Sequence, residues 1–116
     1  MKPYFFTLFL LTFSGNLLAN IECSGSVGGV TLSPGGDVFM GAFKNWDWQK
    51  VCNVEIKINN TTPSSCKAIL SLLLTAQTTK KNVSFWFNDN QTTCEASEQA
   101  RWTTLQNWYF GPKLVN

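Results

Sequence analysis

The chain lacks the residues on which most enzyme and metal sites are built. It has no histidine, and its four cysteines include no C-x-x-C pair. Histidine is the commonest general base, and zinc sites use histidine and closely spaced cysteine. No two carboxylates have a spacing that pairs them for sugar hydrolysis, and the glycine-rich Gly25–Gly36 lacks the lysine and helix start of a phosphate-binding loop. We therefore expect no catalytic residue, no metal and no cofactor.

Charge and long apolar runs are also scarce. Charged residues make up 14% of the chain, and the net charge is +2. Nucleic-acid binding depends on cationic side chains that neutralise phosphates, so we expect no nucleic-acid partner. The longest late apolar run, Ala68–Ala76, contains Ser71 and Thr75 and is too short to span a membrane.

The first residues have the pattern of an export signal. A single lysine, Lys2, precedes an apolar stretch over residues 4–13, and the small residue Ala19 closes the segment. A basic start, a short apolar middle and a small residue at the end are typical of a secretory signal peptide. We expect residues 1–19 to be this peptide and residues 20–116 to form one domain that is secreted or periplasmic.

The four cysteines predict two disulfides. An even number of cysteines in a short exported chain is typical of a disulfide framework, which supplements the core of a small domain. Four cysteines allow three pairings. We favour Cys52–Cys66, which joins a strand to the helix after it, and Cys23–Cys94, which ties the amino end to the late strands.

The first half of the chain has strand patterns. We expect a hairpin over residues 23–43, with strands at 25–32 and 37–43 joined by the turn Ser33–Gly36. An alternation of apolar and polar residues over 51–58, with Cys52 and Ile56 on one face, predicts a third strand.

In the second half of the chain, the spacing of apolar residues changes from that of a strand to that of a helix and back. Thr62 followed by Pro63 suits a helix start, and residues 66–76 have helical spacing of apolar residues. Residues 82–88 alternate as a strand, with Val83, Phe85 and Phe87 on one face. We place the last strand at residues 99–105 and an aromatic tail at 108–112. Three strands, a helix and two strands give a mainly β domain with one α-helix, in the element order of an OB-fold five-stranded barrel.

The segments CNVEIKI, SSCKAILSLLLTAQTTKKNVSFWFND and the late A-R-W resemble a group of small exported bacterial proteins. The chain also resembles the B subunits of subtilase cytotoxin and typhoid toxin, through Cys52, Cys66, Val83–Phe87 and Phe110-Gly111-Pro112. The resemblance covers roughly residues 50–112. It implies an OB-fold subunit that forms a ring of five, binds cell-surface glycans and has a catalytic A subunit as partner. None of the sugar-contacting residues of that family has a match here.

These observations indicate an exported, non-enzymatic binding module for cell-surface carbohydrate. Trp46, Asp47 and Trp48 are the candidate ligand-binding residues, because aromatic rings stack on sugars and carboxylates accept from hydroxyls. Trp86 and Leu74 are the candidate interface residues of a homo-oligomer. Trp102 and Trp108 are assigned to packing.

Two other functions stay open. One is a secreted or periplasmic inhibitor or protein-interaction domain that uses the loop at Asn88–Thr93 or at 45–49. The other is an OB-fold that stacks single-stranded nucleic acid on its aromatic rings, which the low net charge disfavours.

Overall fold

The computed structural model describes residues 21–44, 46–88, 94 and 101–115. In these ranges the elements are β1 (Ile21–Ser26), β2 (Gly29–Leu32), β3 (Asp37–Gly41), β4 (Gln49–Asn53), α1 (Pro63–Thr79), β5 (Asn82–Phe87) and β6 (Trp108–Val115). The expected signal peptide, residues 1–19, lies outside the described residues.

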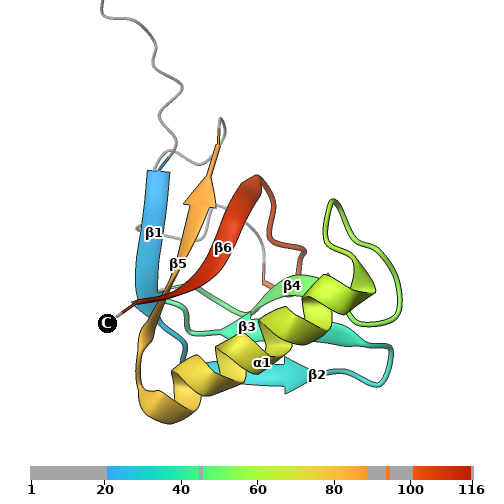
Figure 1. Ribbon diagram of the computed structural model, residues 1–116, viewed down its shortest axis with the longest axis horizontal. Coiled ribbons are helices and arrows are strands. Elements are labelled where there is room, and N and C mark those ends of the chain that lie inside the picture. The colour runs from blue at the N-terminus through green and yellow to red at the C-terminus, as the bar shows by residue number, and fades with distance from the viewer. Residues whose placement is uncertain (1–20, 45, 89–93, 95–100, 116) are drawn as a thin grey trace, which may run out of the picture.

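The strands form two antiparallel sheets that share the helix (Figure 1). One sheet has the order β1-β5-β6 and the other the order β2-β3-β4. The prediction of a mainly β domain with one helix is confirmed. The predicted number of five strands is wrong, because the described part of the chain has six, arranged as two three-stranded sheets.

The additional strand comes from the first predicted strand, which divides at Val27–Gly28. β1 pairs with β5 as far as Ser26, opposite Asn82, and β2 pairs with β3 from Gly29. Between them, a Cβ on Gly28 would lie 2.5 Å from the Cβ of Ala42. Only glycine fits this close approach, so the chain can pass from one sheet to the other within two residues.

The predicted third strand, 51–58, is wrong in its second half. β4 ends at Asn53, and the side chain of Asn53 accepts hydrogen bonds from the backbone N–H of Glu55 (2.6 Å) and of Ile56 (3.0 Å). A side chain that binds the backbone in this way replaces the strand ladder with a turn. Ile56 is consequently 60% exposed, although its position in the alternation placed it in the core.

The predicted last strand, 99–105, is also misplaced. Residues 95–100 lie outside the described residues, and the last strand of the described chain is β6, which begins at Trp108. Trp102 has a φ of 69°, in the left-handed region that ends an extended run. Among residues 101–105, which the structure describes, Thr104 alone forms a bridge, parallel to Lys50 of β4.

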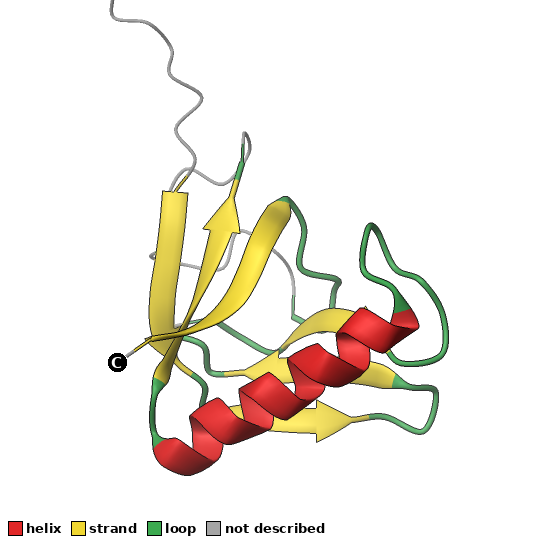
Figure 2. Ribbon diagram, viewed as in Figure 1, coloured by secondary structure: helices red, strands yellow, loops and turns green. Residues whose placement is uncertain are grey.

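The helix starts where its sequence predicts and ends at Thr79. The hydroxyl of Thr62 accepts from the N–H of Ser65 at 3.2 Å, and Pro63 occupies the first helical position. Lys80, with a φ of 56°, ends the helix in the left-handed conformation. α1 contacts β2, β3 and β4 of one sheet and β5 and β6 of the other, so it covers the junction of the two sheets (Figure 2).

The core lies between the sheets and the helix. The predicted inward face of β5 is confirmed, since Val83, Phe85 and Phe87 are fully buried. From the other elements come the buried side chains of Val38, Met40, Val51, Leu73, Ala76 and Leu105.

Both predicted disulfides, Cys23–Cys94 and Cys52–Cys66, are confirmed. The first links β1 to the segment after β5, and the second links β4 to the first turn of α1.

Candidate functional site

Trp46 lies in the core rather than on the surface. Its side chain is 3% exposed, and its Nε1–H donates to the carbonyl oxygen of Cys94 at 3.0 Å. Its ring packs edge-to-face on Phe43, with the centroids 5.1 Å apart, and against Phe87 at 5.6 Å. Neither face of this indole is free for a ligand.

Trp48, two residues later, lies on a pair of glycines. Gly29 of β2 and Gly41 of β3 are directly opposite each other in the sheet. A Cβ on Gly29 would come within 2.7 Å of Cη2 of Trp48, and one on Gly41 within 2.4 Å of Cε2. A residue with a Cβ at either position would overlap the ring, so both positions require glycine for the indole to pack on the sheet. We call Gly29 and Gly41 the glycine seat. An aromatic ring that packs over glycines in this way is a recognised feature of sheets.

Trp102 covers the other face of Trp48. The two rings are stacked, 5.6 Å between centroids and 15° between planes, and Phe39 meets Trp102 edge-on at 5.4 Å. The backbone fixes this position, because the N–H of Trp102 donates to the carbonyl oxygen of Trp48 at 2.8 Å. We call Phe39, Trp48 and Trp102 the ring stack. Trp102 packs on Trp48 and Phe39 and is at the same time 49% exposed.

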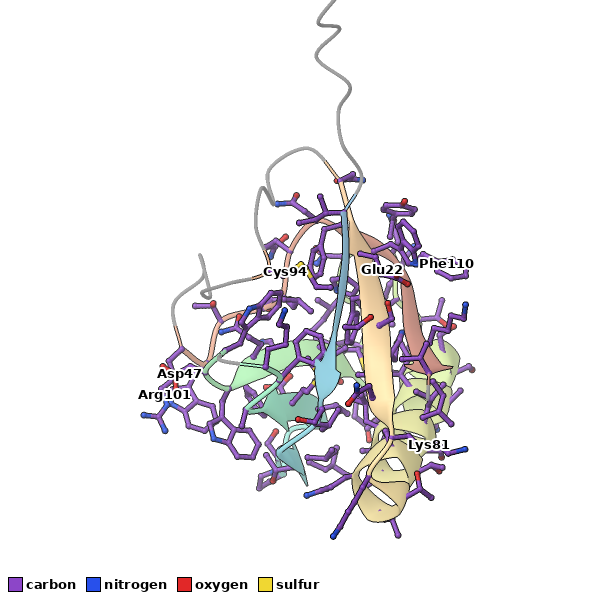
Figure 3. All side chains as sticks on the ribbon, turned by 90° about the vertical axis from the view of Figure 1, so that its left-hand side faces the viewer. Glu22, Asp47, Lys81, Cys94, Arg101 and Phe110 are labelled. Atoms are coloured by element: carbon purple, nitrogen blue, oxygen red, sulfur yellow. A yellow bond between two sulfur atoms is a disulfide. The ribbon has the colours of Figure 1, made fainter. Side chains whose placement is uncertain are left out.

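Two charged side chains stand beside the ring stack. Nε of Arg101 lies 3.9 Å from Oδ1 of Asp47, with both side chains more than half exposed. The guanidinium carbon of Arg101 is 5.0 Å from the centre of the Trp102 ring, within the range of a cation–π contact. Figure 3 shows Asp47 and Arg101 together at one edge of the molecule. The structure therefore brings Asp47 and Trp48 together with Trp102 and Arg101, and separates them from Trp46.

A concave site lies away from the ring stack and shares no residue with it. It is a cavity of about 640 Å³ between the loop before α1, the first turns of α1, the end of β5 and the start of β6. Much of its lining is side-chain amide, and we call it the amide pocket. The amides are those of Asn59, Asn60, Asn88, Gln106 and Asn107.

The sequence analysis did not single out the amide pocket. Its only signal is the two adjacent amide pairs, Asn59-Asn60 and Gln106-Asn107, which lie far apart in the chain. The N–H of Asn88 donates to the carbonyl oxygen of Asn107 at 2.9 Å. This bond holds the end of β5 against the segment that enters β6, so Asn88 lies beside the pair Gln106-Asn107, and the loop before α1 adds the pair Asn59-Asn60.

The candidate interface residues lie elsewhere. Leu74 of α1 is 45% exposed. Trp86 of β5 is half-buried and stands opposite Glu22 of β1. Neither residue belongs to the ring stack or lines the amide pocket. Of the proposed inhibitor loop at Asn88–Thr93, residues 89–93 lie outside the described residues.

The described ranges contain neither a metal-binding cluster nor a membrane-spanning helix. No group of three or more cysteine and carboxylate side chains there could hold a metal ion. No helix there has the length and apolarity to cross a membrane. Comparison with protein-family models, with curated proteins and with solved structures finds no match to this chain.

Proposed function

We propose that this protein is an exported, non-enzymatic carbohydrate-binding module, and that the ring stack with Asp47 and Arg101 is a binding surface. The observation that carries the proposal is Trp102, a large aromatic side chain that is 49% exposed and yet held in place by Trp48 and Phe39. A large exposed aromatic side chain of this kind is found more often at a recognition surface than at a surface that binds no partner.

The chemistry of the surface suits a sugar. One side of a sugar ring presents C–H groups, which pack on an indole, and its hydroxyls both donate and accept hydrogen bonds. The carboxylate of Asp47 accepts, and the guanidinium of Arg101 donates. Because the backbone and Trp48 already fix Trp102, little side-chain entropy is lost when a ligand stacks on it.

The proposed architecture is an OB-fold-like barrel of which the two sheets are the two halves. The chain continues from β1 into β2 across Val27–Gly28, which joins the sheets on one side. On the other side, Lys50 of β4 donates its N–H to Thr103 and accepts from the N–H of Leu105, at 2.9 and 2.8 Å. Barrels of this type bind oligosaccharides on strand faces and adjoining loops.

Secretion or a periplasmic location belongs to the same proposal. The two disulfides support this location, because such bonds form and persist in oxidising compartments.

A homo-oligomer, a ring of five by the resemblance, and a catalytic A subunit remain proposed partners. The exposed Leu74 supports self-association through α1. Light scattering on residues 20–116 should give a mass above that of the monomer, and Leu74→Glu should lower it. A monomer at micromolar concentration would contradict this part of the proposal.

The carbohydrate function is tested with a broad glycan array and titration calorimetry on the best glycan. Trp102→Ala should weaken binding about tenfold or more, as loss of a central aromatic does at an interface. Leu32→Ala is the matched control, because Leu32 is a large apolar side chain with the same exposed fraction, 49%, outside the ring stack. An array without signal, or equal loss in both variants, would remove the proposal.

A protein-binding function is the second candidate. Tryptophan and arginine are the residues most enriched at the energetic centres of protein interfaces, and the site contains both. In that case the glycan array gives no signal. A pull-down with the wild-type chain recovers a partner protein, and a pull-down with Trp102→Ala does not.

A further inference from the structure

We propose that the amide pocket is a second binding site, and that it takes an uncharged sugar unit. This inference rests on the proposed carbohydrate function, and it adds both a location and a ligand class. The amide pocket shares no residue with the ring stack, so the two sites can fail separately.

The pocket has the size and depth of a ligand site. Its volume of about 640 Å³ falls within the roughly 300–1,000 Å³ usual for small-molecule sites. Four parts of the chain form its walls: residues 59–61, Ser65 and Ile69 of α1, Asn88 after β5, and residues 106–109 with Gly111. Helix α1 and strand β6 provide part of this lining, which places Ser65, Ile69, Trp108 and Tyr109 on regular elements.

The amides supply the hydrogen-bonding groups that sugar hydroxyls need. Each asparagine side chain offers one acceptor and two donors, and a hydroxyl both donates and accepts. Within the part of the chain that the structure describes, the side-chain amides of Asn59, Asn60, Asn88 and Asn107 have no hydrogen-bond partner. A ligand can therefore bind these amides by displacing water, without breaking a hydrogen bond among the described residues.

The charge of the lining selects an uncharged ligand. None of the residues that line the pocket is acidic or basic, so an anionic sugar would find no cation to pair with. The start of α1 is the one feature that could attract an anion. There the N–H of Ser65 is taken by the hydroxyl of Thr62, and that of Cys66 by the carbonyl oxygen of Thr62.

Aromatic side chains complete the site. Trp108 meets Phe85 edge-on, with the centroids 5.4 Å apart and the planes at 90°, so the core fixes its ring. Tyr109 is 50% exposed and provides a further ring with a hydroxyl. With Ile69, these rings give the apolar wall on which the C–H face of a sugar can pack.

The amide pocket is distinct from the ring stack. In Figure 3, Phe110, the strand neighbour of Tyr109, lies at the opposite edge of the molecule from Asp47 and Arg101. Removal of Tyr109 should therefore leave the ring stack intact.

The test is an NMR titration of ¹⁵N-labelled residues 20–116. The probes are lactose, maltose, cellobiose and mannobiose, with 3′-sialyllactose as the charged counterpart of lactose. At least one neutral disaccharide should shift the side-chain NH₂ signals of Asn60 and Asn107. That binding should weaken about tenfold in Asn60→Ala and in Tyr109→Ala. Phe110→Ala is the matched control, because it removes a neighbouring exposed ring that does not line the pocket.

Three results would overturn the inference. If a neutral sugar shifts only the indole N–H of Trp102, or binds Asn60→Ala as it binds wild type, the amide pocket is not a site and the proposed function stands. If 3′-sialyllactose shifts the pocket signals more than lactose does, the ligand is not uncharged. If no sugar shifts any signal of the folded protein, and the glycan array is also silent, the proposed function falls with the inference.

Discussion

The molecule has two aromatic clusters, an inner one in the core and an outer one at the surface. The inner cluster, Phe43, Trp46, Phe85 and Phe87, is buried between the sheets. The outer cluster is the ring stack of Phe39, Trp48 and Trp102, on the sheet β2-β3-β4. Trp46 and Trp48 are two residues apart and belong to different clusters.

The difference shows that the surroundings of a tryptophan, not its neighbours in sequence, decide its role. Trp46 has a carbonyl oxygen for its N–H and phenylalanines for its ring, so it belongs to the core. Trp48 has two glycines beneath it and a second indole above it, so it supports an exposed ring. The first arrangement should govern stability, and the second should govern binding.

The largest effect should follow from removing the disulfide that borders the inner cluster. Cys23 and Cys94 are 71 residues apart, and the chain-entropy model gives about 4 kcal/mol for a loop of this length. Cys23→Ser with Cys94→Ser should therefore lower the free energy of unfolding in urea by about 4 kcal/mol. It should also loosen Trp46, whose acceptor is the carbonyl of Cys94.

The other disulfide is the control for this prediction. Cys52 and Cys66 are 14 residues apart, so Cys52→Ser with Cys66→Ser should cost less, about 3 kcal/mol. The reverse order of the two losses would show that chain entropy does not dominate here.

The same substitution in the two clusters gives the next largest effect. Trp46→Phe leaves a buried gap and an unpaired carbonyl, so it should lower the free energy of unfolding by about 2–3 kcal/mol. Trp102→Phe keeps an exposed ring on Trp48 and should change it by less than about 0.5 kcal/mol. Urea unfolding checks both values. Equal losses would mean that the ring stack is as structural as the core.

The sequence predicted the elements in which local chemistry and tertiary contacts agree. Thr62-Pro63 marked the helix start, and the alternation of Val83, Phe85 and Phe87 marked a core-facing strand. The cysteine pairing followed from the order of the elements. For the helix start and the core-facing strand, a short stretch of chain contains the whole signal.

The sequence-based predictions were wrong or incomplete where one side chain redirects the backbone, and where segments distant in the chain meet. The side chain of Asn53 ended a strand whose apolar alternation continued through Ile56. Trp48 and Trp102 form one site only because the N–H of Trp102 bonds to the backbone of Trp48. Nothing in the segment around either residue records that contact, and the same holds for the two amide pairs.

A smaller effect should come from filling the glycine seat. Gly41→Ala would place a methyl group 2.4 Å from Cε2 of Trp48, so the indole must move, at a cost of about 1–2 kcal/mol. Gly35→Ala is the control, because the nearest atom to its Cβ would be 4.0 Å away. In a Trp48→Ala background the Gly41→Ala cost should nearly vanish, which a double-mutant cycle measures. An unchanged cost would show that the seat is not what requires glycine.

The smallest effect on stability should come from the ion pair beside the ring stack. Asp47 and Arg101 are 3.9 Å apart and more than half exposed, so Asp47→Asn should change the free energy of unfolding by less than about 0.5 kcal/mol. Asp37→Asn is the comparison, because Asp37 is 29% exposed and pairs with Lys50 at 3.8 Å while accepting from Nδ2 of Asn53 at 2.8 Å. It should cost more, about 1 kcal/mol. If Asp47 is at a binding surface, Asp47→Asn weakens glycan binding while Asp37→Asn does not. If calorimetry finds the same glycan affinity for both variants, Asp47 is an ordinary surface charge and not part of a binding surface.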